Sequence, residues 1–289
     1  MFRALHFFTS PAARYLAAAD IGSNDWWRYV LGVIFIAACW IGGGGYVYMQ
    51  VLEIPLGAVS NFVALNASIL MLLVAVVVVV IVLHRRPWLT LITPYPAIDW
   101  RRVMLGAMVW GVLLLLGAAA ENLIFPGRYA WTADWSSWLP FVAAALLLIP
   151  LQCLAEELMF RGYLVQGLAR LSRRPAFLVV MSSVLFTLPH LFNPEVEAYG
   201  AWIMAANYFA MALFFATIAL RDGRLELAIG AHISNNLLLA LGVNYAGSVF
   251  ETPSLFTANT LDPVYSLVTL LLGAAVFHLW VFRVRLSNE

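Results

Sequence analysis

The chain has 289 residues, of which 63% are hydrophobic and 11% charged, and its formal net charge is +1. Soluble domains carry roughly 25% charged residues, so this composition excludes an ordinary soluble domain. The small net charge and the lack of a dominant basic patch argue against nucleic acid as a partner. A chain this apolar is expected to span lipid, where the backbone satisfies its hydrogen bonds only as helices or as a closed barrel.

The apolar runs decide between these two architectures. Barrel strands alternate apolar and polar residues over about 10 positions. Here the runs are continuous and close to the roughly 20 residues that a helix needs to cross the hydrocarbon core. We therefore predict an all-α polytopic membrane protein, a bundle of about eight transmembrane helices. The expected spans are 29–49, 62–83, 103–124, 139–160, 176–192, 202–220, 225–244 and 264–282.

Residues 1–28 precede the first expected span and contain no apolar core long enough for a cleaved signal peptide. Large apolar side chains alternate there with arginines, which is typical of an amphipathic segment at the membrane interface. These side chains are Phe2, Leu5, Phe7, Phe8 and Leu16, with Arg3 and Arg14 between them. We predict a cytoplasmic or interfacial N-terminus over 1–28 and one transmembrane helical domain over 29–289.

The arginines indicate the orientation, because cytoplasmic connections of membrane proteins are enriched in basic residues. With eight spans, fifteen of the sixteen basic residues fall on one side of the membrane and only Arg128 on the other. An even number of spans places both termini on the arginine-rich side, which we predict to be the cytoplasm. The connection 84–102 contains Pro94-Tyr95-Pro96 and is expected to be extended rather than helical.

Ionisable groups inside a span cost roughly 2.5–3.5 kcal/mol each, so each one requires an explanation. Glu121, Glu226 and His278 lie at span ends, and His6 and His84 lie in connections, where no special role is needed. Three polar segments lie deeper in the expected spans. They are Glu156-Glu157-Leu-Met-Phe-Arg161-Gly162-Tyr163, Phe186-Thr-Leu-Pro-His190 and His232-Ile-Ser-Asn-Asn236.

In the first segment, Glu157 and Arg161 are four residues apart, share one helix face and can form an ion pair. Glu156 points about 100° away and lacks that partner. A carboxylate that faces a bundle interior without a cation suits a general base. The alternative is that both glutamates only cap the end of a helix near Arg161, and the two later polar segments weigh against it.

In the third segment, His232 and Asn236 lie on one helix face at positions i and i+4. A buried histidine is usually structural, and an asparagine in a span often holds helices together. Together with Glu156 and His190, however, the pair predicts a hydrolytic site in which a carboxylate activates water and two donors hold an oxyanion. Their convergence requires the fourth helix to extend to about residue 168.

The patterns Glu-Glu-x-x-x-Arg, Phe-x-x-x-His and His-x-x-x-Asn occur in this order between residues 156 and 236. They resemble the type II CAAX prenyl protease family and its bacterial relatives, the CPBP or Abi group. The resemblance implies an eight-span intramembrane endopeptidase of the bacterial inner membrane. It would cleave a membrane-associated protein or peptide, in contact with membrane lipid, with its catalytic core at about 139–245.

The resemblance also implies roles for single residues. Glu156 would activate water with the help of His190, while His232 and Asn236 would stabilise the oxyanion. The pair of Glu157 with Arg161 would support the site.

A metal site is the competing interpretation of the same residues. Glu156, His190 and His232 could ligate zinc and leave one position open. The segments lack a local His-Glu-x-x-His arrangement, and Asn236 is a poor zinc ligand. We therefore favour a glutamic mechanism that needs no cofactor, with zinc as the alternative.

Two other function classes remain open. Buried carboxylates and histidines also serve proton-coupled small-solute transporters, although these would show inverted repeats that this chain lacks. A non-catalytic membrane factor for immunity or sorting could keep the same fold.

Overall fold

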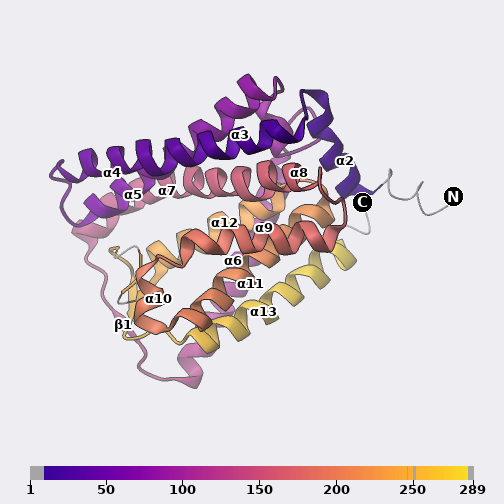
Figure 1. Cartoon of the computed structure of the whole chain (residues 1–289). Coiled ribbons are helices and arrows are strands. Elements are labelled where there is room, and N and C mark those ends of the chain that lie inside the picture. The colour runs from indigo at the N-terminus through magenta and orange to yellow at the C-terminus, as the bar shows by residue number, and fades with distance from the viewer. Residues whose placement is uncertain (1–9, 246, 250–251, 286–289) are drawn as a thin grey trace.

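The computed structural model describes residues 10–245, 247–249 and 252–285. Over these residues the chain is almost entirely helical, with one small sheet (Figure 1). Within them, six helices are long and apolar enough to cross a membrane, which confirms the predicted all-α polytopic membrane fold. They cover Trp26–Leu52, Ser60–Leu83, Trp100–Ile124, Trp135–Leu168, Ala201–Asp222 and Pro263–Arg283.

The two other expected spans coincide with shorter helices. Helix α9 covers Pro175–His190, and helix α12 covers Glu226–Leu237 and continues as a π-helical turn to Gly242. Both are shorter than the roughly 20 residues of a complete crossing. Leu225 and the first seven residues of α12 are all buried, so protein surrounds this part of the helix on every side. The two short helices are the ones that carry His190, His232 and Asn236.

Several of the long spans contain π-helical turns. The first span joins α3 (Trp26–Ala37) to α4 (Gly45–Leu52) through such a turn, and α5 (Ser60–Val78) ends in another. The fourth span joins α7 (Trp135–Glu157) to α8 (Val165–Leu168) through the π-helical turn Leu158–Leu164, so it reaches residue 168 as expected. This turn directly follows the two glutamates, and π-helical turns inside helices are frequent at functional sites.

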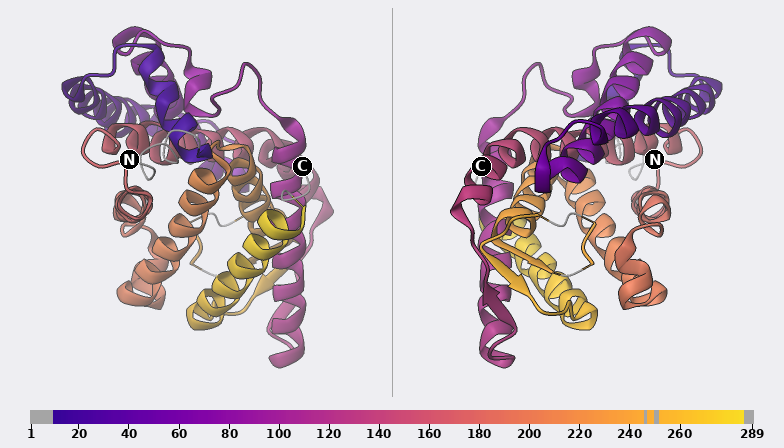
Figure 2. Two further views of the ribbon diagram at one scale, coloured as in Figure 1. Left: turned by 90° about the vertical axis from the view of Figure 1, so that its right-hand side faces the viewer. Right: turned by 90° about the vertical axis from the view of Figure 1, so that its left-hand side faces the viewer.

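The helices form layers on the two sides of α7. Helices α3, α4 and α5 lie on one side, and α9, α11 (Ala201–Asp222), α12 and α13 (Pro263–Leu279) lie on the other (Figures 1 and 2). Helix α2 (Pro11–Ala17) and the last turns of α13 lie at the same end of the bundle, as an even number of spans requires (Figure 1).

Helix α2 packs onto this end of the bundle. Tyr15 and Leu16 are buried, and the Tyr15 hydroxyl lies 2.6 Å from the Leu91 carbonyl oxygen and 3.1 Å from that of Arg161. The N-terminal segment therefore touches the turn that follows the two glutamates. The apolar residues expected on an amphipathic face at 2–8 lie outside the described residues.

The connection 84–99 folds into the bundle. It is not helical apart from the 3₁₀ turn Trp88–Leu91, and Leu91 and Ile92 are fully buried. The Leu225 N–H donates to the Ile92 carbonyl oxygen at 2.8 Å. Helix α12 therefore begins inside the bundle, and His232 reaches the depth of the other site residues although it lies only eight residues after Arg224.

Helices α6 (Trp100–Ile124) and α12 approach each other closely through two glycines. A Cβ atom at Gly106 would lie 2.2 Å from the Leu227 carbonyl oxygen, and one at Gly230 would lie 1.9 Å from that of Val103. Only residues without a side chain allow this approach. This close contact fixes the relative orientation of α6 and α12, including the turn after each glycine, which lies beside the site.

A small sheet lies at the end of the bundle opposite α2 (Figure 1). Strand β3 (Phe256–Ala258) lies in its centre, antiparallel to β1 (Tyr129–Trp131) and parallel to β2 (Val243–Tyr245). No strand was expected from the sequence.

Candidate active site

A cavity of about 570 Å³ lies among α6, α7, α9, α11, α12 and α13 and extends to the sheet. All four residues expected to be catalytic line it, namely Glu156, His190, His232 and Asn236. They come from three helices and from positions about 80 residues apart in the sequence. The structure thus brings the three polar segments together, as the hydrolytic interpretation required.

Glu157 points away from the cavity and into the protein. Its Oε1 lies 3.0 Å from the Arg161 guanidinium and 2.9 Å from His232 Nδ1, and all three side chains are buried. The Arg161 guanidinium also stacks on the Phe186 ring, 4.2 Å from its centroid. Pairing makes these buried charges tolerable. The ion pair of Glu157 with Arg161 is present as expected, and His232 joins it as a third member.

Glu156 lines the cavity and has a different set of neighbours. Its Oε1 accepts a hydrogen bond from Gln152 Nε2 at 3.2 Å, and its Oε2 lies 3.8 Å from His232 Nε2. No arginine of the described residues forms an ion pair with it. Gln152 was not among the expected site residues, although a polar residue one turn before Glu156 in an apolar span was the available signal.

His190 is the last residue of α9, and Pro189 stands in the final turn of the helix. His190 Nδ1 lies 2.7 Å from the Phe186 carbonyl oxygen, and the imidazole stacks on the Phe186 ring with centroids 4.2 Å apart. The Tyr208 ring packs against it at 5.0 Å. When Nδ1 carries the proton donated to the carbonyl, Nε2 is an acceptor available to the cavity.

Asn236 and His232 present two nitrogens side by side. Asn236 Nδ2 lies 3.5 Å from His232 Nε2, so both atoms can approach one oxygen placed between them. Asn236 Oδ1 accepts a hydrogen bond from Asn235 Nδ2 at 3.1 Å, and Asn235 Oδ1 accepts one from Trp110 Nε1 at 3.2 Å. Trp110 and Asn235 were not among the expected site residues.

The zinc alternative can be tested against these positions. Both histidines hold Nδ1 against an oxygen, which is the usual arrangement when Nε2 ligates a metal. The described residues nevertheless contain no group of three His, Cys, Asp or Glu side chains that could hold a metal ion. The donor types therefore suit zinc, whereas their placement does not.

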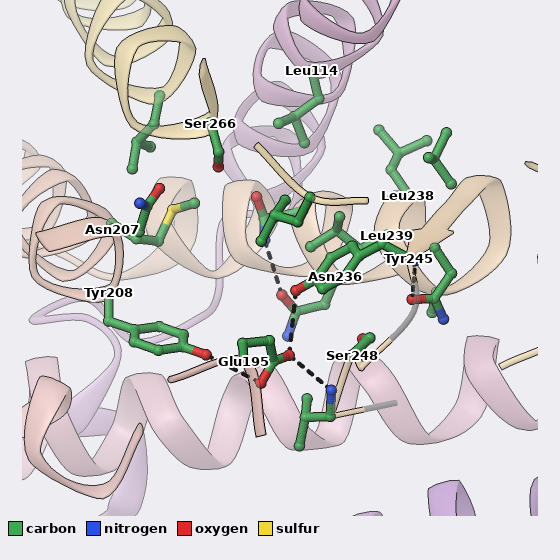
Figure 3. Close-up of a pocket in the computed structure, with 18 of the residues that line it drawn as sticks. Leu114, Glu195, Asn207, Tyr208, Asn236, Leu238, Leu239, Tyr245, Ser248 and Ser266 are labelled. Atoms are coloured by element: carbon green, nitrogen blue, oxygen red, sulfur yellow. Dashed lines mark hydrogen bonds between the residues drawn. The ribbon is translucent and has the colours of Figure 1, made fainter. Parts of the chain in front are cut away.

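A buried carboxylate that the sequence analysis did not single out also lines the cavity. Glu195, in α10 (Pro194–Tyr199), accepts hydrogen bonds from the Tyr245 hydroxyl at 3.2 Å, the Val249 N–H at 2.7 Å and the Tyr208 hydroxyl at 3.5 Å (Figure 3). Figure 3 shows these groups converging on it close to Asn236. Glu195 thereby joins the segment that follows α12 to the tyrosine that packs on His190.

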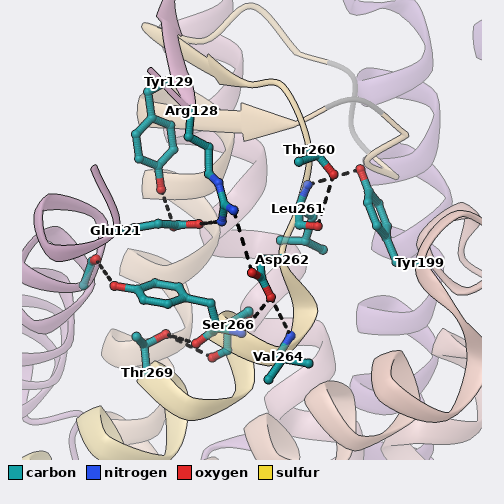
Figure 4. Close-up of polar contacts among 12 residues, drawn as sticks. Glu121, Arg128, Tyr129, Tyr199, Thr260, Leu261, Asp262, Val264, Ser266 and Thr269 are labelled. Atoms are coloured by element: carbon teal, nitrogen blue, oxygen red, sulfur yellow. Dashed lines mark hydrogen bonds and ion pairs between the residues drawn. The ribbon is translucent and has the colours of Figure 1, made fainter. Parts of the chain in front are cut away.

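An ion-pair cluster lies at the sheet end of the cavity. Arg128 contacts Glu121 through Nη1 and Asp262 through Nη2, and the Tyr129 hydroxyl donates to the other Glu121 oxygen (Figure 4). Glu121 was expected only as a span-end charge, but its side chain lines the cavity. Arg128, which the spans placed alone on its side of the membrane, is held between two carboxylates.

A second cluster, at the opposite end of the bundle, holds the turn after the two glutamates. His84 is fully buried, with Nδ1 2.9 Å from the Ser23 carbonyl oxygen and Nε2 3.0 Å from the Tyr163 hydroxyl. Arg86 donates to Gln166 Oε1 at 2.6 Å. Burial lowers the pKa of His84 to about 4, so this histidine is neutral at physiological pH.

Comparison with known proteins shows a family similarity over the part of the chain that carries the site. Residues 135–238 match the family described as type II CAAX prenyl endopeptidase Rce1-like. The chain is also 34% identical over 185 residues to the uncharacterized protein YyaK of Bacillus subtilis (strain 168). That match covers 63% of this chain and 61% of the relative, so the chain spans about three fifths of the relative's length.

The family match begins at the first residue of α7 and ends two residues after Asn236. It therefore contains all three polar segments, and the resemblance inferred from them is confirmed. Over residues 135–238, this membrane protein is similar to the Rce1-like family of type II CAAX prenyl endopeptidases.

Proposed function

We propose that this protein is an intramembrane endopeptidase that hydrolyses a peptide bond in a membrane-associated protein or peptide. The observation that carries the proposal is the convergence of Glu156, His190, His232 and Asn236 on one cavity among apolar helices. The family match over 135–238 supports the same class of reaction.

Glu156 acts as the general base, because it is the cavity-facing carboxylate without an arginine partner. A water molecule gives one proton to Glu156, and its oxygen attacks the carbonyl carbon of the scissile bond. His190 Nε2 accepts a hydrogen bond from the other O–H of the same water and so orients it. The proton on Glu156 then passes to the leaving nitrogen as the C–N bond breaks.

His232 and Asn236 stabilise the tetrahedral intermediate, because their nitrogens lie 3.5 Å apart and can both donate to its oxyanion. His232 donates from Nε2 when it is protonated. In that form the charges of Glu156, Glu157, Arg161 and His232 sum to zero, which suits a buried cluster. Glu157 holds Nδ1 and so directs Nε2 towards the cavity.

No cofactor is needed for this mechanism. Glu156, His190 and His232 have the donor types that zinc prefers, but their placement does not suit a metal ion, so no step is assigned to one.

The same proposal includes the location of the protein. We place it in the bacterial inner membrane with both termini in the cytoplasm, because the arginines concentrate on that side. Glu156 lies twelve residues before the end of α8, which is about 18 Å along a helix. A substrate segment must therefore enter the bilayer to reach it.

The test uses the full-length protein reconstituted in liposomes. It is incubated with a solubilised bacterial membrane fraction, and newly formed protein amino termini are labelled and identified by mass spectrometry. Wild-type protein should create specific new termini. The nearly isosteric Glu156→Gln variant should create none. Equal sets of new termini with both proteins would contradict the proposal.

A further inference from the structure

We infer that Trp110 fixes the orientation of the Asn236 side chain through Asn235, and is thus a positioning residue for the oxyanion contact. The inference rests on the proposed function, because it concerns the donor that faces the intermediate. Trp110 belongs to α6, outside the three polar segments and outside the matched residues 135–238.

An asparagine side chain can be placed in two orientations that differ by a half turn of its amide group. Its oxygen and nitrogen ends have almost the same shape, so only hydrogen-bond partners decide which end faces which way. The indole N–H of Trp110 can only donate. The atom of Asn235 that lies 3.2 Å from it must therefore be the oxygen.

The orientation of Asn235 in turn determines the orientation of Asn236. With its oxygen towards Trp110, Asn235 points its NH₂ group towards Asn236 at 3.1 Å. The atom of Asn236 that receives this bond must be Oδ1. Asn236 Nδ2 is then the end that lies beside His232 Nε2, 3.5 Å away. One donor on α6 thus decides that Asn236 presents a donor, rather than an acceptor, to the oxyanion.

The helix packing holds the relay in place. Trp110 stands four residues after Gly106 and Asn235 five residues after Gly230, the two glycines at which α6 and α12 meet. Trp110 is 1% exposed and Asn235 7% exposed, so both side chains are buried where the helices pack. On its other side the indole contacts α13, where a Cβ atom at Gly273 would lie 3.2 Å from the ring.

The sharpest test is Asn235→Asp, compared with Asn235→Ala. Aspartate still accepts the Trp110 bond, but its second oxygen can only accept, so Asn236 must turn Nδ2 towards it and present Oδ1 to the oxyanion. We expect kcat to fall about 100-fold with KM nearly unchanged, as when an oxyanion donor is removed. Alanine leaves Asn236 without this bias, and kcat should fall less than about tenfold. If Asn235 had only a structural role, Asn235→Asp would keep a higher kcat than Asn235→Ala, because aspartate preserves the shape and the Trp110 contact.

The second test separates positioning from packing. Trp110→Phe removes the N–H but keeps an aromatic ring, and should lower kcat severalfold. In an Asn236→Ala background the same substitution should have no further effect on kcat, because the residue through which it acts is gone. If the two effects multiply, Trp110 acts through the fold and the inference is overturned. Melting temperatures of all variants show whether each is folded.

Both tests use a fluorogenic peptide built on a cleavage site found by terminal labelling. Asn236→Ala is measured in the same series. If it retains the wild-type kcat, the oxyanion role in the proposed function fails. If it loses activity while Asn235→Asp is at least as active as Asn235→Ala, only the Trp110 relay is overturned.

Discussion

Glu157 and His232 are joined by a 2.9 Å contact between Oε1 and Nδ1, and the same oxygen lies 3.0 Å from the guanidinium of Arg161. The contact connects α7 to α12 at the depth of the cavity. The neighbouring carboxylate of Glu156 points into the cavity and has no arginine partner. Two adjacent glutamates in one helix therefore differ in their surroundings: Glu157 is held in a buried ion pair, whereas Glu156 faces the cavity, where we propose that it acts as the base.

Because only Glu157 belongs to the buried ion pair, replacing each glutamate by glutamine should change the free energy of unfolding by different amounts. Glu157→Gln leaves Arg161 and His232 without their anion, and breaking a buried ion pair costs about 3–5 kcal/mol. The variant should melt markedly lower and lose activity. Glu156→Gln should be equally inactive but should melt close to the wild type. Thermal unfolding of both variants in the same detergent checks this, and equal melting temperatures for the two would count against the assignment.

The buried His84 predicts a dependence of stability on pH. Burial lowers its pKa from 6.5 to about 4 in the folded state, so the unfolded chain binds the proton more readily. The contribution of neutral His84 to the free energy of unfolding is fully present above about pH 6.5 and is lost as the pH falls from there towards 4. It amounts to at most about 3 kcal/mol.

The measurement is the melting temperature of the detergent-solubilised protein between pH 7 and about pH 4. His84→Gln removes the titrating group while keeping a polar side chain between Ser23 and Tyr163. Its melting temperature should change less over this range than that of the wild type. Parallel curves would exclude His84 as the origin.

Glu195 should matter through the groups that it holds. Glu195→Ala leaves the Tyr245 hydroxyl and the Val249 N–H without their acceptor, and each buried unsatisfied group costs about 1–3 kcal/mol. Protease cleavage near Val249 should become faster and activity should fall, because Tyr208 also loses a partner beside His190. Glu195→Gln keeps an acceptor oxygen and should resemble the wild type. If alanine and glutamine behave alike, the carboxylate does not hold this segment.

Whether the activity depends on a metal ion can be measured directly with chelators. Among the described residues, no three His, Cys, Asp or Glu side chains lie close enough together to hold one metal ion, so we expect the activity to survive dialysis against EDTA or phenanthroline. Added zinc should not increase it. Activity that disappears with chelator and returns with zinc would assign Glu156, His190 and His232 as ligands instead.

The fold followed from the sequence because burial in lipid imposes long apolar helices. All eight expected spans coincide with helices of the described residues, and the fourth reaches residue 168. The sequence did not show that α9 and α12 are short, and the start of α12 depends on how the connection 84–99 folds inward. That inward fold is also what brings His232 to the depth of Glu156.

The site was predictable where charge in a span required an explanation, as for Glu156 and His232. Gln152 offered a signal through its place one turn before Glu156. Trp110 and Asn235 were not predictable, because an uncharged polar residue in a span has many ordinary structural uses. Their roles depend on which helix faces which, and this is set by the contacts at Gly106 and Gly230. Glu195 was missed because it lies after a helix end, where a charge needs no explanation.

The most direct measurement follows one identified substrate in liposomes with water enriched in oxygen-18. Wild-type protein should add one oxygen-18 atom to each new carboxyl terminus, because water attacks the peptide carbonyl. Glu156→Gln should lower kcat by about 10²–10⁴ while the protein remains folded, which is the usual contribution of a general base. Cleavage by Glu156→Gln at the wild-type rate would contradict the central claim that Glu156 activates the water.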